Sequence, residues 1–155
     1  MDNKLAKSIE CSYNVETSSI SADDKVVHTI STMAEGEGTL EVLGLTGAEK
    51  RALFGGENEV GFGLGVDMKQ PQMALMFEQK KADGAKMLYV IYDVKFNPAG
   101  LSATSVEGGV EEQTISLDFQ SIANEAGFFY FCVDTAEAGA ETLAQQWYTQ
   151  VQQVI

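Results

Sequence analysis

Positive charge is what this chain most lacks. Its 155 residues include 10 Lys and Arg against 23 Asp and Glu, which gives a formal net charge of −13. No Lys or Arg follows Lys95. Tight nucleic-acid binding relies on basic side chains that neutralise phosphates, so the charge balance argues against a DNA-binding function and favours solubility.

Long apolar runs, cysteine and histidine are also scarce. No run approaches the roughly 20 residues of a membrane span, and the first ten residues lack the apolar stretch of a signal peptide. We therefore expect a soluble protein made in the cytosol. Cys11 and Cys132 are expected to be buried thiols, with a disulfide as the alternative. His28 is the only histidine, and we expect it in a strand, at an interface or on the surface.

The residues that could carry catalysis do not form a recognisable set. One histidine cannot supply a two-histidine metal site, and a triad would need partners that the sequence does not indicate. Asp23 and Asp24 are too few for a calcium loop. Glu111 and Glu112 are adjacent, so in a strand they would point to opposite faces. We predict no enzyme, no cofactor and no metal.

Alternation of apolar and polar residues dominates what is present. In residues 7–16, four apolar or weakly polar side chains share one face and polar side chains share the other, which predicts a half-buried strand. The first face carries Ile9, Cys11, Tyr13 and Val15, and the second carries Ser8, Glu10, Ser12, Asn14 and Glu16. Residues 24–32 and 38–44 are predicted as two further strands, separated by a turn over 34–38.

The middle of the chain predicts a short helix and a hairpin. Thr46 and Glu49 have the spacing of a capping box, and Gly55 is placed to end the helix. Two apolar runs, 72–81 and 85–96, flank an Asp-Gly pair, which is a strong hairpin signal. The first half of the second run is apolar on both faces, as in a central strand.

The last third predicts a loop, two strands and a helix. Residues 97–112 are rich in turn formers, and loops of that length often contact partners. Residues 113–120 alternate, with Ile115, Leu117 and Phe119 inward, and 127–134 form a buried strand. Asp134 and Glu137 have capping-box spacing before a helix at about 135–153. Its narrow apolar stripe contains Leu143, Trp147, Val151 and Val154.

The stretch "EVGFGLGV", residues 59–66, has glycine at every second position. A phosphate-binding loop needs a helix after its glycines, and here Pro71 and another strand follow. We therefore interpret it as a strand with a bare face at Gly61, Gly63 and Gly65, against which another chain could pack.

The order of these segments resembles the major tail proteins, or tail tube proteins, of long non-contractile-tailed bacteriophages. The resemblance lies in "LTGAEKRALFGG", "QMALMFEQKKADGAKMLYVIYDVKFNPAG", "EQTISLDFQS" and an acidic turn before a helix with Trp147 and Val151. It covers residues 35–155 well and the start only loosely. Relatives in that family carry more chain before the first strand.

The resemblance implies a single tail-tube domain over residues 1–155. Its fold would be mainly β with flanking helices (α+β), as a β-sandwich or partly closed barrel. It implies hexameric rings stacked into a virion tail tube that is assembled in the host cytoplasm. Tape-measure and tail-end proteins would be partners, DNA would pass without specific binding, and no membrane would be involved.

An acidic channel wall would repel phosphates, since six chains at −13 each carry a formal charge of −78. The predicted channel-lining residues are Glu10, Ser12, Asn14, Glu16, Thr114, Ser116 and Asp118. The predicted subunit contacts are the 97–112 loop, Gly61, Gly63, Gly65, Trp147 and Val151.

Two other interpretations stay open. A tube protein of a secretion or contractile injection system would share the same sheet architecture by resemblance. A monomeric β-sandwich binding module would need an exposed aromatic platform, whereas most aromatic residues here fall in apolar strand runs.

Overall fold

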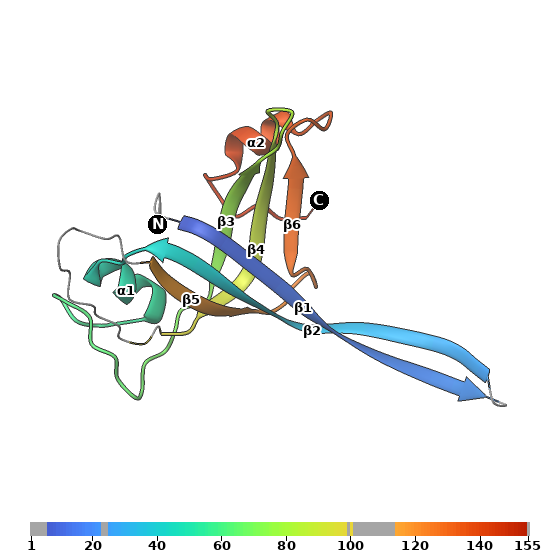
Figure 1. Cartoon of the computed structure of the whole chain (residues 1–155), viewed down its shortest axis with the longest axis horizontal. Coiled ribbons are helices and arrows are strands. Elements are labelled where there is room, and N and C mark those ends of the chain that lie inside the picture. The colour runs from blue at the N-terminus through green and yellow to red at the C-terminus, as the bar shows by residue number, and fades with distance from the viewer. Residues whose placement is uncertain (1–5, 23–24, 99, 101–113, 155) are drawn as a thin grey trace, which may run out of the picture. The chain divides into compact units, whose positions relative to one another are not determined.

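Most of the described chain is β-strand. The computed structural model describes residues 6–22, 25–98, 100 and 114–154. Six strands form an antiparallel sheet, with few and short helices. The elements are β1 (Ala6–Ala22), β2 (Lys25–Leu43), α1 (Gly47–Phe54), β3 (Met73–Lys80), β4 (Lys86–Phe96), β5 (Thr114–Ser121), β6 (Tyr130–Asp134) and α2 (Glu141–Gln146) (Figure 1). The prediction of a mainly β fold with flanking helices is confirmed at this level.

The chain folds as two compact units. The first comprises residues 1–71 and 96–120, and the second comprises 72–95 and 121–155. Strands β4 and β5 contribute residues to both units. The single tail-tube domain over residues 1–155 stays a prediction.

A long hairpin, β1–β2, dominates the first unit. The prediction of separate strands at 24–32 and 38–44 is wrong, because β2 runs unbroken from Lys25 to Leu43. The turn expected over 34–38 is instead paired with β1, with Gly36 opposite Tyr13 and Gly38 opposite Cys11. A register shift between Asn14 and Val15 absorbs one extra residue of β2. Cross-strand hydrogen bonds thus keep a turn-like composition extended.

Phe119 explains why β2 carries glycine at position 38. A Cβ atom there would lie 2.3 Å from the Phe119 ring and 2.5 Å from the Glu10 carbonyl oxygen. Phe119 also packs edge-on against Phe96, with ring centroids 5.6 Å apart. The expected inward positions of Leu117 and Phe119 are confirmed, since both are fully buried. This cluster forms the apolar side of β2 and β5.

Helix α1 begins and ends where the sequence predicts. The Thr46 hydroxyl accepts a hydrogen bond from the Glu49 amide, and the Glu49 carboxylate accepts one from the Thr46 amide at 2.8 Å. The bond from the Thr46 amide, together with one that the Thr46 hydroxyl donates to the same carboxylate at 2.9 Å, lowers the pKa of the Glu49 carboxyl. Gly55 ends the helix in the left-handed conformation, at φ 81°. The capping box is confirmed.

The stretch 59–66 is not a strand, so the predicted bare strand face is wrong. It is an irregular loop in which Gly61 has φ 77°, outside the strand region. The loop turns back on α1, where an Arg51 guanidinium nitrogen donates to the Gly61 carbonyl oxygen and Phe62 contacts Phe54. Attachment to the helix therefore replaces strand pairing.

In the second unit, β3 and β4 form the predicted hairpin. Met76 lies opposite Val90, and Lys81 and Ala85 close the turn, with Gly84 at φ 87°. Strand β6 pairs with the same segment of β4. It is shorter than the strand expected over 127–134, and only Val133 is buried among its residues. The expectation of buried thiols also fails for Cys132, which is exposed, while Cys11 is half-buried.

The C-terminal helix expected at about 135–153 is also wrong in extent. Only Glu141–Gln146 is helical, and α2 follows Ala140 without a side-chain cap. The Asp134 carboxylate accepts instead from the Ala136 amide at 3.0 Å and from Lys81 at 2.6 Å. Gly139, at φ 93°, interrupts any earlier helix.

Trp147 is the centre of the second core. It is fully buried with Leu88, Val90, Tyr92, Val133 and Ala140. Downstream, the Tyr92 hydroxyl donates to the Gln152 carbonyl oxygen at 2.6 Å. The C-terminal segment therefore packs on one face of this unit's sheet by burying a single large side chain.

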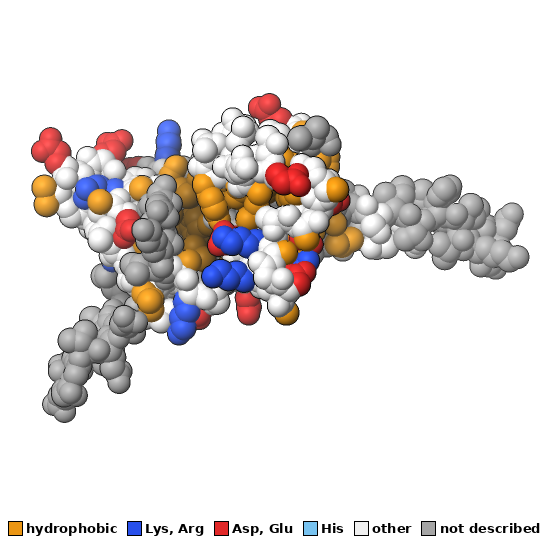
Figure 2. Space-filling view, turned by 90° about the horizontal axis from the view of Figure 1, so that it is seen from above, with side chains coloured by type: hydrophobic (Ala, Val, Ile, Leu, Met, Phe, Trp, Pro, Cys, Tyr) orange, Lys and Arg blue, Asp and Glu red, His pale blue; other side chains and the backbone are white. Residues whose placement is uncertain are grey.

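Some large apolar side chains lie outside both cores. On the face seen in Figure 2, apolar side chains reach the surface next to acidic and basic ones. The most exposed include Val60 at 89% and Leu64 at 62% in the loop after α1. Val15 at 52% and Met33 at 54% lie opposite each other on the β1–β2 hairpin.

Candidate functional site

One face of the first unit is polar on all three of its strands. Because β1 and β2 are antiparallel, residues directly opposite one another point to the same side. The Thr39 hydroxyl donates to Asp118 Oδ1 at 3.0 Å, which places the matching residues of β5 on that side too. This acidic face consists of Ser8, Glu10, Ser12, Asn14, Glu35, Glu37, Thr39, Glu41, Thr114, Ser116, Asp118 and Gln120.

The acidic face holds five carboxylates. They belong to Glu10, Glu35, Glu37, Glu41 and Asp118, and the twelve residues that form the face include no Lys or Arg. Hydroxyl groups donate to two of these carboxylates: Ser8 donates to Glu41 Oε2 at 2.8 Å, and Thr39 donates to Asp118 Oδ1 at 3.0 Å. Like charges on neighbouring strands repel one another and any approaching anion.

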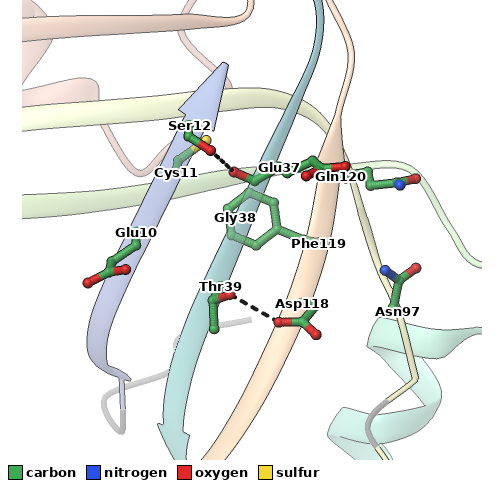
Figure 3. Close-up of a pocket in the computed structure, with 10 residues that line it drawn as sticks. All are labelled: Glu10, Cys11, Ser12, Glu37, Gly38, Thr39, Asn97, Asp118, Phe119 and Gln120. Carbon is green, nitrogen blue, oxygen red and sulfur yellow. Dashed lines mark hydrogen bonds between the residues drawn. The ribbon is translucent and has the colours of Figure 1, made fainter. Parts of the chain in front are cut away.

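An open hollow lies in this region of the first unit. Figure 3 shows its lining, with Glu10 and Ser12 from β1, Thr39 from β2 and Asp118 from β5. The bond between Thr39 and Asp118 spans two strands at its centre. Within the described residues, no three His, Cys, Asp or Glu side chains are grouped closely enough to hold a metal ion.

The structure brings together most of the predicted channel-lining residues. Glu10, Ser12 and Asp118 line the hollow itself. Asn14, Thr114 and Ser116 are exposed on the same face, whereas Glu16 lies beyond the register shift of the hairpin. Their role in a channel stays a prediction.

Three carboxylates of this face are not among the channel-lining residues predicted from the sequence. Glu35, Glu37 and Glu41 alternate with Gly36, Gly38 and Leu40 in "EGEGTLEV", which has the period of a strand. Gly36 and Gly38 favour the turn predicted over 34–38, and this turn hides the alternation of the carboxylates around them. Counting the period through the glycines would have found all three.

The residues predicted as subunit contacts differ in exposure and in local structure. Gly61, Gly63 and Gly65 are exposed, but in an irregular loop. Trp147 is fully buried in its own unit, and its role as a subunit contact stays a prediction. Val151 is exposed, and its contact role stays a prediction. The 97–112 loop falls almost entirely outside the described residues.

The distal half of the β1–β2 hairpin is exposed wherever its side chains are described. All described side chains in residues 14–19 and 31–35 are exposed. Figure 1 shows this part continuing beyond β5 as a two-stranded ribbon. His28 belongs to this part of β2, opposite Ile20, as the expectation of a strand residue requires. Two-stranded ribbons are marginally stable alone in water.

The cysteines do not form a site. Burial raises the pKa of the Cys11 thiol, and Cys132 is exposed on β6. A raised thiol pKa means little thiolate at neutral pH, so Cys11 is a poor nucleophile.

No protein-family model matches the chain, and no curated protein matches it. Among the described helices, none is long and apolar enough to span a membrane.

Proposed function

We propose that this chain is a structural subunit of a phage tail tube, which assembles into stacked hexameric rings. The acidic face of the first unit would line the channel. The observation that carries the proposal is this face, with five carboxylates across three strands and no basic residue among its members. A wall of that sign repels the phosphates of passing DNA instead of binding them.

The uncovered part of the hairpin supports self-assembly. A ribbon exposed on both faces has unpaired edges and little burial to hold it. Pairing or packing with a neighbouring copy would provide both. Under this proposal the chain itself has the tail-tube fold, a β-sandwich or partly closed barrel. The inner sheets of neighbouring subunits would join into a continuous barrel around the channel, in the virion tail after assembly in the host cytoplasm. Tape-measure and tail-end proteins would be its partners, with no catalytic role.

Electron microscopy of the purified protein over a range of concentrations tests the assembly. Hollow rings or tubes are the expected result, and particles that stay monomeric at the highest concentration would contradict it. The orientation of the acidic face needs a second measurement in assembled tubes. In a Cys11→Ser, Cys132→Ser background, Ser116→Cys should react with a small maleimide and be located inside the tube by a gold-cluster label.

A tube protein of a secretion or contractile injection system is the related alternative. It makes the same prediction in the microscope. Neighbouring genes separate the two: tape-measure and head genes point to a phage, and genes for a membrane complex point to secretion.

One observation favours the binding-module alternative. The rings of Phe77 and Tyr89 stack on the second unit's sheet, with centroids 4.9 Å apart and planes 12° apart. Tyr130 is exposed on the neighbouring strand β6, where it lies opposite Ile91. Aromatic faces of this kind can stack on sugar rings. A glycan-array signal from a monomeric protein, lost in Tyr89→Ala, would favour the module over the tube.

A further inference from the structure

The loop after α1 presents three apolar side chains to solvent. Val60 is 89% exposed, Leu64 is 62% exposed and Val66 is fully exposed. Single exposed apolar residues are ordinary on protein surfaces, but three within seven residues of one loop form a patch. We call residues 57–66 the apolar loop.

The apolar loop is attached to the helix at several points. Arg51 donates to the Gly61 carbonyl oxygen, and the rings of Phe62 and Phe54 lie 5.7 Å apart. At its base, Gly55 passes so close to Lys69 that a Cβ atom would lie 2.2 Å from the Lys69 carbonyl oxygen. The side chains that point outward are thus carried on a fixed backbone, and holding it in place costs little further entropy on binding.

A second patch of matching chemistry lies on the hairpin. Val15 and Met33 are directly opposite and half-exposed, and the next pair on the same face, Thr17 and Ser31, has hydroxyls 3.4 Å apart. We call these four residues the ribbon patch. It offers apolar surface beside hydroxyl donors.

Acidic residues on both sides of the three apolar side chains limit what the apolar loop can bind. Glu57 and Glu59 precede Val60, and Asp67 follows Val66. These carboxylates would be repelled by an anionic lipid surface. The Thr17 and Ser31 hydroxyls share one hydrogen bond, which leaves one hydroxyl hydrogen that can be donated to such a carboxylate. The ribbon patch therefore offers the loop both an apolar and a polar contact.

The two patches belong to the same unit: the apolar loop follows α1, whereas the ribbon patch is on the part of the β1–β2 hairpin that extends away from α1 (Figure 1). A loop therefore cannot reach the ribbon patch of its own chain. We infer that the apolar loop of one copy docks on the ribbon patch of a second copy, an inference that rests on the proposed self-assembly. The contact is head-to-tail, so each copy keeps a free loop or a free ribbon patch until a ring closes or a filament grows.

Two polar variants test this contact. The loop variant carries Val60→Ser, Leu64→Ser and Val66→Ser, and the ribbon variant carries Val15→Ser and Met33→Ser. A control carries Ile122→Ser and Phe128→Ser, which are exposed apolar residues of the second unit. Circular dichroism checks the fold, and sedimentation velocity measures assembly. Each test variant alone should be monomeric, with at least a tenfold loss of assembled mass, while the control should assemble like the unchanged protein.

Mixing the two test variants at equal concentration gives the decisive result. One functional loop and one functional ribbon patch remain, so the mixture should form dimers and nothing larger. Assembly of the loop variant at the unchanged level would overturn the inference while leaving the tube proposal standing. A mixture that stays monomeric would overturn it too. If the unchanged protein never assembles, the proposed function fails and the inference fails with it.

A cross-link provides a check that does not depend on removing side chains. In a Cys11→Ser, Cys132→Ser background, Leu64→Cys with Met33→Cys should give a ladder of disulfide-linked copies under copper-phenanthroline oxidation. The same background with Leu64→Cys and Ile122→Cys should give no ladder. Equal ladders from both pairs would contradict the contact.

Discussion

The two halves of the β1–β2 hairpin share strands, pairing and alternation, yet they differ in what covers them. In the proximal half, Gly38 and Leu40 lie under β5 residues such as Phe119, and one face is closed. In the distal half, every described side chain in residues 14–19 and 31–35 is exposed. An alternating sequence can therefore form a strand whether or not another strand covers one of its faces.

Removing the cover of the proximal half should have the largest effect. Phe119→Ala deletes a fully buried ring that contacts Gly38 and Phe96, and we expect a loss of about 3–5 kcal/mol in the free energy of unfolding. Urea unfolding measures it. Val15→Ala in the distal half should change the same quantity by less than about 0.5 kcal/mol. Equal losses would end the distinction between the halves.

Adding one methyl group beneath Phe119 should lower the free energy of unfolding by less than removing the Phe119 ring does. Gly38→Ala places a Cβ atom against both the Phe119 ring and the Glu10 carbonyl oxygen, and the backbone oxygen cannot rotate away as a side chain can. We expect a loss of about 1–3 kcal/mol, from the same unfolding experiment. Gly100→Ala is the matched control, because nothing lies within 4 Å of its added carbon. A tolerated Gly38→Ala would show that β5 does not close over β2 as described.

Acid should weaken the ion pair between Lys81 and Asp134 in the second unit. Because this pair lies outside the hairpin, it gives a stability change that does not depend on how the hairpin is covered. The hydrogen bond from Lys81 lowers the pKa of Asp134, helped by the Ala136 amide. Its stabilisation is therefore present above the ordinary carboxyl value of 3.8 and lost as pH falls through the lower folded-state pKa.

Unfolding of Asp134→Asn and of the unchanged protein between pH 7 and pH 2 measures this stabilisation. The difference between them should hold constant down to about pH 4 and shrink below it. Lys81→Met should reproduce the pattern. A difference that grows on acidification would mean that the sign is wrong.

Shortening the ribbon should have the smallest effect on folding. Replacing residues 16–32 by an Asn-Gly turn removes the exposed side chains of residues 16–19, 31 and 32 and keeps the Val15–Met33 pair. The free energy of unfolding should stay within about 0.5 kcal/mol. A loss above about 2 kcal/mol would show that the distal half supports the fold itself.

Two capping-box patterns show where prediction from sequence succeeds and fails. Thr46 with Glu49 caps α1 as expected. Asp134 and Glu137 have the same spacing, but Lys81 from the β3–β4 turn holds the Asp134 carboxylate and Gly139 interrupts the backbone. A local signal holds when no distant residue competes for the same side chain.

The candidate site was predicted in part for the same reason. Glu10, Ser12 and Asp118 follow from alternation, which needs no knowledge of distant partners. Glu35 and Glu37 fall in the turn that the glycines at positions 36 and 38 predict, and only pairing with β1 keeps that segment extended. Glu41 lies in the strand predicted over 38–44 but is not among the predicted channel-lining residues. For residues 59–66 the error is the reverse: alternation predicts a strand, whereas contacts with Arg51 and Phe54 hold the segment as a loop.

By itself the sequence determined the alternating faces, the β3–β4 hairpin, the limits of α1 and the acidic balance, because these depend on residues close together in the chain. Only the tertiary structure decided which alternating segments are covered. Phe119 reaches Gly38 across some eighty residues, and Trp147 is buried in the core of the second unit. Such contacts depend on long-range packing, which local periodicity does not encode.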